Sequence, residues 1–368
     1  MKKRVAVAMS GGLDSSVAAG LLSGQGYDII GINMILSDPP GRYDSAYCEK
    51  EGFDDAAKVA AKIGFPFHIL NCRKEFDEKI IDYFCSEYLG GRTPNPCAIC
   101  NKELKFGRLM REAMKLQADC VATGHYACVE YDKSIGRHLL KKGKDSKKDQ
   151  SYFLFMLSQE QLSRTLFPLG EYTKQEVKKK AKEQGLKVYD KPSSQEICFI
   201  EKDYRDYLRT KLSGSKISST ADSFGAGYIK NMKGETAGEH SGIAFYTIGQ
   251  RKGIGAHNKP AYVISINQEE NSIVIGEEKD LYNDRLIAER VNWIDRGKLM
   301  GSVEVAVKIR YRHTEAEAVV IPVNDNDVEV QFKQPQRAIT PGQAAVFYMG
   351  EKVAGGGWIK EVPGENRL

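Results

Sequence analysis

The segment that most restricts how this chain can fold is a glycine turn near its start. An apolar run at residues 4–8, typical of a buried strand, precedes Met9-Ser10-Gly11-Gly12-Leu13-Asp14-Ser15-Ser16. A helical stretch follows at residues 17–22. Strand, glycine turn and helix in this order predict the first unit of a parallel α/β sheet, with the turn at the carboxyl end of the strand.

This turn presents the groups that bind an anion. Gly11 and Gly12 let the backbone turn tightly and approach a ligand, and the helix that follows offers N–H groups and the positive end of its dipole. The lysine of a Walker A loop is missing, which argues against a P-loop kinase or GTPase. We therefore expect Asp14 to hold Mg²⁺ and, with it, pyrophosphate released from ATP. The alternative is an ordinary strand-to-helix turn in which a serine caps the helix.

Two periodicities alternate over the first half of the chain. Apolar runs predict strands at residues 5–9, 29–35, 66–70 and 120–123. Helical patterns lie at residues 14–23, 54–63, 75–88 and 102–115. Alternation of this kind predicts an α/β fold with a doubly wound parallel sheet. Ligands of such sheets bind beyond the carboxyl ends of the strands, where both the glycine turn and Thr123-Gly124-His125-Tyr126 are expected.

After this region the helical pattern fades, and short alternating runs typical of strands take over. We expect an N-terminal catalytic unit at 1–204, a small, mainly β central unit at 205–284 and a C-terminal β-barrel at 285–368. Alternating strands at 303–309, 316–323 and 328–332, with a turn at 324–327, carry the barrel prediction.

Composition limits the setting in which this protein works. The net charge is +5 and no apolar run approaches the length of a membrane span. The basic start is followed by too short an apolar run for a signal peptide, so we expect a cytoplasmic protein, and nothing requires more than a monomer. A loop at residues 141–148 and a helix at 178–182 are rich in lysine. Such runs are usually solvated faces, and only other features make nucleic acid a candidate partner.

The eight cysteines are unevenly placed. Five stand alone beside apolar segments, where burial is expected: Cys48, Cys72, Cys85, Cys120 and Cys128. Cys97 and Cys100 form C-x-x-C after two prolines, and Cys198 lies in a second loop. We expect a helix to begin just after Cys100, which would lower the pKa of that thiol and favour the thiolate.

Several motifs together resemble the tRNA-specific 2-thiouridylase family, a group of PP-loop ATP pyrophosphatases. They run along nearly the whole chain and are S-G-G-x-D-S-S, R-T-P-N-P-x-x-x-C-N, A-T-G-H-Y, K-D-Q-S-Y-F-L, S-Q-x-x-C-F and Y-T-I-G-Q-R-K-G. The resemblance implies that ATP adenylates the C2 oxygen of the wobble uridine in tRNAs for Lys, Glu and Gln. Sulfur then replaces that oxygen, and AMP and pyrophosphate are released.

The resemblance also assigns residues. It implies that Cys100 is the nucleophile and that Cys198 carries persulfide sulfur. We expect the sulfur donor to be a persulfide carrier, a cysteine desulfurase or sulfide. The residues implied to bind ATP are Ala8, Met9, Ser10, Gly11, Gly12, Leu13, Asp14, Ser15, Ser16, Met34 and Gly124. Those implied to contact the tRNA anticodon stem-loop are Asn95, His125, Lys148, Asp149, Gln150, Arg310, Tyr311 and Gln343.

One position departs from the family pattern. Well-known members carry an Asp three residues before the nucleophile, whereas this chain has Cys97 there. A thiol cannot take over the work of a carboxylate, so Cys97, Cys100 and Cys198 are alternatively three ligands of a [4Fe–4S] cluster whose open iron holds the sulfur. A zinc site, a redox-active pair, and a reduced pair in which only Cys100 is catalytic are further alternatives.

Two other functions stay open. The chain is alternatively another ATP-dependent synthetase of the PP-loop group, or a non-enzymatic, ATP-gated RNA-binding module. Neither explains thiols in two separate loops, and AMP release measured with and without tRNA separates the module from an enzyme.

Overall fold

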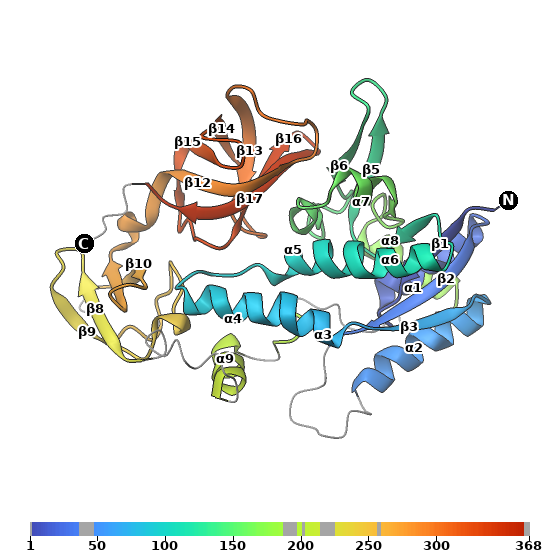
Figure 1. The fold of residues 1–368 in the computed structure, drawn as a ribbon, viewed down its shortest axis with the longest axis horizontal. Helices are drawn as coiled ribbons and strands as arrows, with labels where there is room; N and C mark the ends of the chain where they lie inside the picture. Colours follow the sequence, from blue (N-terminus) through green and yellow to red (C-terminus); the bar gives the residue numbers. More distant parts are fainter. Residues whose placement is uncertain are drawn as a thin grey trace.

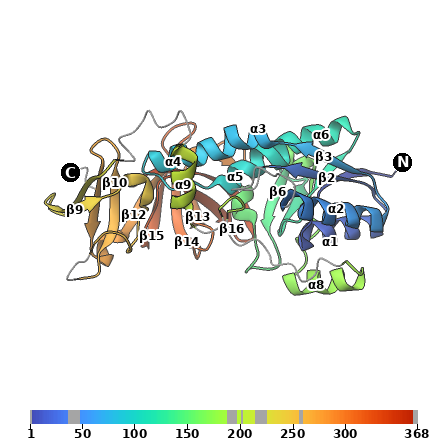
Figure 2. The same cartoon turned by 90° about the horizontal axis from the view of Figure 1, so that it is seen from below.

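A computed structural model describes residues 2–36, 48–186, 197–200, 203–213, 225–255 and 259–363. The molecule is elongated, with the N-terminal sheet at one end and two β-rich parts toward the other (Figures 1 and 2). Within these residues, no helix combines the length and apolar character that crossing a membrane requires.

The N-terminal part is a parallel sheet with strand order β3-β2-β1-β4-β7. Its strands are β1 (Arg4–Ala8), β2 (Asp28–Ile35), β3 (Phe67–Asn71), β4 (Cys120–Ala122) and β7 (Thr165–Leu166). The four strands expected from apolar runs are confirmed, whereas β7 is too short to leave a pattern. Because β1 lies between β2 and β4, the winding reverses there, and the ligand crevice of such a sheet opens at the carboxyl ends of these strands.

Helices cover both faces of this sheet, which confirms the doubly wound fold. One face carries α1 (Leu13–Gly24), α2 (Cys48–Ile63) and α8 (Lys174–Glu183), and the other carries α6 (Leu109–Lys115). Neighbouring residues of a strand point to opposite faces. Val5 accordingly packs in the core beneath α1, and Ala6 packs in the core beneath α6.

Two long helical segments run between the sheet and the far end of the molecule (Figure 1). The first consists of α3 (Arg73–Phe76), the π-helix η1 (Asp77–Ile81) and α4 (Asp82–Leu89). The second consists of α5 (Pro96–Cys100), the π-helix η2 (Asn101–Arg108) and α6. The helices expected at 75–88 and 102–115 are confirmed, but the second begins at Pro96, before the cysteine pair and not after it.

Part of the expected lysine-rich loop is a β-hairpin in the structure. Strands β5 (Ala127–Asp132) and β6 (Arg137–Lys142) pair with each other, and β6 also pairs with a strand of the C-terminal barrel. Lys141 and Lys142 therefore lie in a strand, and the loop begins at Gly143. The N-terminal part thus extends the sheet of the barrel. The boundaries at 204 and 284 stay a prediction.

The central part is a mixed four-stranded sheet with order β10-β11-β8-β9, in which β11 and β8 are parallel. Its strands are β8 (Gly227–Asn231), β9 (Thr236–His240), β10 (Tyr262–Asn267) and β11 (Ser272–Gly276), with the 3-10 helices η6 (Ile243–Phe245) and η7 (Glu278–Leu281) beside them. Helix α9 (Tyr204–Ser213) shares one core with α4 and this sheet.

The C-terminal part is a six-stranded barrel, as the alternating pattern predicts. Its strands follow the order β12-β15-β14-β13-β16-β17, and β12 pairs with β17 to close the ring. They are β12 (Tyr282–Trp293), β13 (Val303–Lys308), β14 (Ala316–Pro322), β15 (Val328–Arg337), β16 (Ala344–Met349) and β17 (Lys352–Glu361). Alternate residues of β13 and β14 are buried, which is the physical basis of the period of two.

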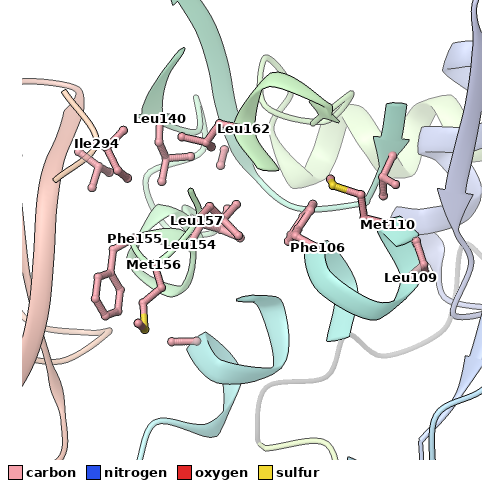
Figure 3. Close-up of a cluster of buried hydrophobic side chains, with 14 of the residues drawn as sticks. Phe106, Leu109, Met110, Leu140, Leu154, Phe155, Met156, Leu157, Leu162 and Ile294 are labelled. Atoms are coloured by element: carbon pink, nitrogen blue, oxygen red, sulfur yellow. The ribbon is translucent and has the colours of Figure 1, made fainter. Parts of the chain in front are cut away.

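One hydrophobic core joins the N-terminal part to the barrel. Between them lie η3 (Ser151–Leu154) and α7 (Gln159–Ser163). Figure 3 shows Phe106 and Leu109 of the helical segment in one cluster with Leu154, with Leu140 of β6 and with Ile294, which follows β12. The cluster fixes the segment that carries the cysteine pair against the barrel, so the two parts pack as one body.

Candidate active site

The glycine turn lies at the carboxyl end of β1 and opens α1. Gly11 has a φ of 71°, which suits glycine. Gly12 is the N-cap in an extended conformation, and no side-chain hydrogen bond from the described residues caps this end. The alternative of a serine N-cap is therefore wrong, and the first N–H groups of α1 face the crevice as donors for an anion.

Hydrogen bonds hold the turn in shape. The hydroxyls of Ser15 and Ser16 donate to the carbonyl of Gly12 at 3.2 and 2.8 Å, and the Ser10 N–H donates to Ser15 Oγ at 3.2 Å. Asn33 donates from Nδ2 to the carbonyl of Met9 at 2.7 Å. Asn33 is buried on β2, so a polar residue inside an apolar run was the sequence signal for this support.

Gly124 packs directly on the start of α1. A Cβ at this position would lie 2.8 Å from the carbonyl carbon of Asp14 and 2.8 Å from the Ser15 nitrogen. Only glycine allows such an approach. Met34 lies at the carboxyl end of β2, partly buried beside the core. Both residues thus lie at the carboxyl ends of the strands, and their contact with ATP remains a prediction.

Asp14 binds two partners that no sequence pattern indicated. Lys174, at the start of α8, donates from Nζ to both carboxylate oxygens at 2.6 and 2.7 Å. The Tyr126 hydroxyl donates to Asp14 Oδ1 at 2.8 Å, and the Lys174 ammonium lies 5.7 Å from the centroid of that ring. Burial and the charge of Asp14 raise the pKa of Tyr126, so its hydroxyl keeps the proton that it donates.

The cysteine pair lies deeper than expected. Asn95 caps α5 by accepting a hydrogen bond from the Ala98 N–H at 3.4 Å, which places Cys100 at the end of this helix. The prediction of a lowered pKa is therefore wrong. Burial raises the pKa of Cys100 to about 11 and that of Cys97 to about 12.

Cys198 is exposed and lies beside the helical segment that ends in α4. The neighbouring Phe199 anchors it, with ring centroids 5.1 Å from Phe84 and 5.7 Å from Phe76. The charges of the three thiols influence one another, so they lie in one neighbourhood. Yet among the described residues no three His, Cys, Asp or Glu side chains are grouped to hold a metal ion. Ligation of an iron–sulfur cluster or of zinc by these cysteines stays a prediction.

Lys105 is the positive charge that the thiols share. It lies in η2, five residues after Cys100, where the wider π-helical turn favours functional placements. Its charge lowers the pKa of Cys97 and Cys100 against the effect of burial, and it lowers that of His125 as well. Lys105 thus influences both thiols and His125, the residue that follows Gly124.

The K-D-Q motif is built around buried hydrogen bonds. Asp149 is buried and accepts from the Gly143 N–H at 3.0 Å and from Ser151 Oγ at 2.8 Å. Gln150 donates its N–H to the carbonyl of Tyr126 at 2.9 Å, and its Oε1 accepts from the Tyr126 N–H at 3.1 Å. Lys148 is partly exposed, and its contact with tRNA remains a prediction.

The other residues expected to contact tRNA lie at the junction of the parts. Asn95 and His125 are buried. Arg310 donates to a barrel carbonyl, and Tyr311 lies against a ring of η3 with centroids 4.5 Å apart. Gln343 donates from Nε2 to the carbonyls of Thr93 and Pro94 at 3.1 and 2.9 Å. It therefore clamps the segment that leads into α5, and contact of these residues with tRNA remains a prediction.

The other cysteines, for which burial was predicted, have ordinary surroundings. Cys72, Cys85 and Cys120 are buried as expected, and Cys128 is half-buried, where its thiol donates to Glu171 at 3.3 Å. All cysteines whose side chains the structure describes are free. The side chain of Cys48 lies outside the described residues.

A doubly wound sheet with this glycine turn at its switch point defines an ATP-using domain of the HUP class. Family models match the chain as a tRNA methyl transferase HUP domain over residues 3–202, a tRNA methyl transferase PRC-barrel domain over 220–277 and an aminomethyltransferase beta-barrel domain over 283–359.

Curated relatives are more specific. The chain is 49% identical over 98% of its length to the tRNA-specific 2-thiouridylase of Heliobacterium modesticaldum, of which it covers 93%. It is 47% identical to that of Clostridioides difficile and 46% identical to that of Moorella thermoacetica, with at least 97% of this chain and 99% of each relative covered. The chain belongs to the tRNA-specific 2-thiouridylase family.

Proposed function

We propose that this chain is an ATP-dependent tRNA 2-thiouridylase that acts on the wobble uridine of tRNAs for Lys, Glu and Gln. The observation that carries the proposal is the link between the glycine turn and the thiols. Gly124 touches the turn, and the next residue, His125, is within the electrostatic reach of Lys105 beside Cys97 and Cys100. A pyrimidine held there would meet an activated phosphate on one side and sulfur on the other.

The first step activates a poor leaving group. The uridine O2 attacks the α-phosphorus of ATP, the bond to pyrophosphate breaks, and O2 becomes part of an adenylate. The free N–H groups of α1 stabilise charge that develops on the phosphates. Asp14 is the carboxylate that would hold Mg²⁺, which would neutralise further phosphate charge.

The second step delivers sulfur. We assign the persulfide to Cys198, because it is exposed and can receive sulfane sulfur from a persulfide carrier or a cysteine desulfurase. Sulfide as the sulfur donor belongs to the cluster alternative, in which the open iron holds it. The terminal sulfur attacks C2, and AMP leaves with the original oxygen. Cys100 then attacks the Cys198 sulfur, which frees the thiouridine and leaves a disulfide for an external thiol to reduce. Anaerobic preparation followed by iron analysis tests the cluster alternative, which predicts bound iron.

We expect the loop that begins at Gly143 and the C-terminal barrel to bind tRNA. Lys148 and Arg310 supply positive charge, and phosphate neutralisation contributes much of the affinity of RNA-binding proteins. Hydrogen bonds of less exposed side chains hold these surfaces in place, and these side chains are Asp149, Gln150 and Gln343. We place the reaction in the cytoplasm, where thiols stay reduced, and expect a monomer to suffice.

Mass analysis of the tRNA nucleosides tests the function. Purified protein with ATP, a sulfur donor and unmodified tRNA should yield 2-thiouridine and one AMP per product, and Cys100→Ala should yield none. The family models carry methyl transferase names, so a methylated product formed with S-adenosylmethionine and without ATP would contradict the proposal.

A further inference from the structure

Lys174 takes no part in the steps above, although it lies beside the glycine turn. Residues 8–16 contain no lysine or arginine, yet they are expected to receive a triphosphate. The Lys174 ammonium reaches this turn from a residue 160 positions further along the chain, and only 15% of its side chain is exposed. A nearly buried ammonium requires an anionic partner, and Asp14 supplies it in this structure.

We infer that Lys174 is the phosphate-binding lysine of the ATP site and contacts the β- and γ-phosphates that leave as pyrophosphate. The inference rests on the proposed function, because it takes ATP as the substrate. Lysine is a point charge on a flexible stem, so its ammonium can turn from the Asp14 carboxylate to a neighbouring phosphate oxygen. When the bond between the α-phosphorus and the bridging oxygen breaks, both electrons stay with pyrophosphate, and Lys174 neutralises part of that charge.

The backbone of Lys174 is fixed for this task. Its N–H donates to Asp145 Oδ2 at 2.9 Å. Thr173 caps α8 in a reciprocal box with Glu176, whose Oε2 accepts from the Thr173 N–H at 2.6 Å. The Tyr126 ring lies beneath the ammonium. The start of α8 is thus held, so only the side chain has to move when the ammonium exchanges one anion for another.

The test compares nucleotides with and without the phosphates in question. In Lys174→Met, the affinity for ATP and for inorganic pyrophosphate, measured by calorimetry, should fall about 10- to 100-fold, as expected for a lost charged hydrogen bond. The affinity for AMP should stay within about twofold, because AMP lacks both phosphates. Lys174→Arg should recover part of the ATP affinity, since it restores the charge.

Controls separate this role from a structural one. Lys178→Met removes the same charge from an exposed position of the same helix and should leave all three affinities unchanged. Lys174→Met leaves the Asp14 carboxylate without its cation, so the double variant Asp14→Asn/Lys174→Met removes both charges together. Thermal unfolding shows whether each variant is folded. Equal ATP affinity in Lys174→Met and wild type, or an equal loss of ATP and AMP affinity, overturns the inference. Wild-type protein that binds no ATP overturns the proposed function as well.

Discussion

The contact of Gly124 with α1 gives the sharpest prediction. In Gly124→Ala, the added Cβ would lie 2.8 Å from the Asp14 carbonyl carbon, 2.8 Å from the Ser15 nitrogen and 2.9 Å from the Asp14 Cβ. Ordinary contact begins at 3.4 Å, so the start of α1 and Gly124 must separate by about 0.6 Å, the difference of these distances. The nearest atoms are backbone and cannot rotate away.

This displacement sets the expected magnitude. Overpacking of this kind costs about 1–3 kcal/mol of unfolding free energy. A shift of the helix that carries the phosphate-binding N–H groups lowers the rate of AMP formation by about tenfold or more, since misplacement by about 1 Å can cost about 100-fold. Urea unfolding measures the first effect, and AMP release in the presence of tRNA measures the second.

A glycine at the other end of the same helix is the matched control. A Cβ at Gly24 would meet no atom within 4 Å, so Gly24→Ala should be neutral or stabilise the protein by up to about 1 kcal/mol through helix propensity. If Gly124→Ala unfolds at the wild-type urea concentration and forms AMP at the wild-type rate, the close approach does not position the site and the reasoning is refuted.

Three further predictions concern the thiols and their support. Cys100→Ala and Cys198→Ala should each abolish thiolation while tRNA affinity, measured by filter binding, stays unchanged; thiolation in either variant contradicts the assigned roles. Lys105→Met should raise the pKa of Cys100 above about 11, because a positive charge that favours the thiolate is lost. The thiolate fraction falls tenfold per pH unit below the pKa, so alkylation of that thiol at pH 8 should slow. An unchanged alkylation rate would show that Lys105 does not act on this thiol. Gln343→Leu should lower the unfolding free energy by about 0.5–1.5 kcal/mol, because two partly buried carbonyls lose their donor, and should slow thiolation more than AMP release. Equal slowing of both contradicts a role confined to the cysteine segment.

The N-terminal sheet and the barrel could be predicted because local patterns carry them. Val5 and Ala6 sit in opposite cores, and a buried strand of this kind shows as an unbroken apolar run. In β13, alternate burial shows as a period of two. The glycine turn could be predicted as well, because a tight turn before a helix restricts which residues fit.

Long-range partners could not be predicted. The pairing of β6 with the barrel depends on residues more than 200 positions apart in the sequence, and no local pattern records it. Pro94 and Pro96 predict a loop, so the sequence places the start of the helix after Cys100, which is wrong. In the structure Pro96 occupies the first turn of the helix, where its missing N–H costs nothing. Burial of Cys100 then reverses the expected direction of its pKa.

The loop that joins β6 to η3 contacts both residues that bind Asp14. On one side, Gln150 holds the backbone of Tyr126, whose hydroxyl binds Asp14. On the other side, Asp145 accepts from the N–H of Lys174, whose ammonium binds the same carboxylate. Lys148 stands between these two contacts in the sequence. If Lys148 binds a tRNA phosphate as proposed, that contact falls in the loop that also holds Tyr126 and Lys174, the two partners of Asp14. We therefore expect tRNA binding to influence ATP cleavage through these hydrogen bonds.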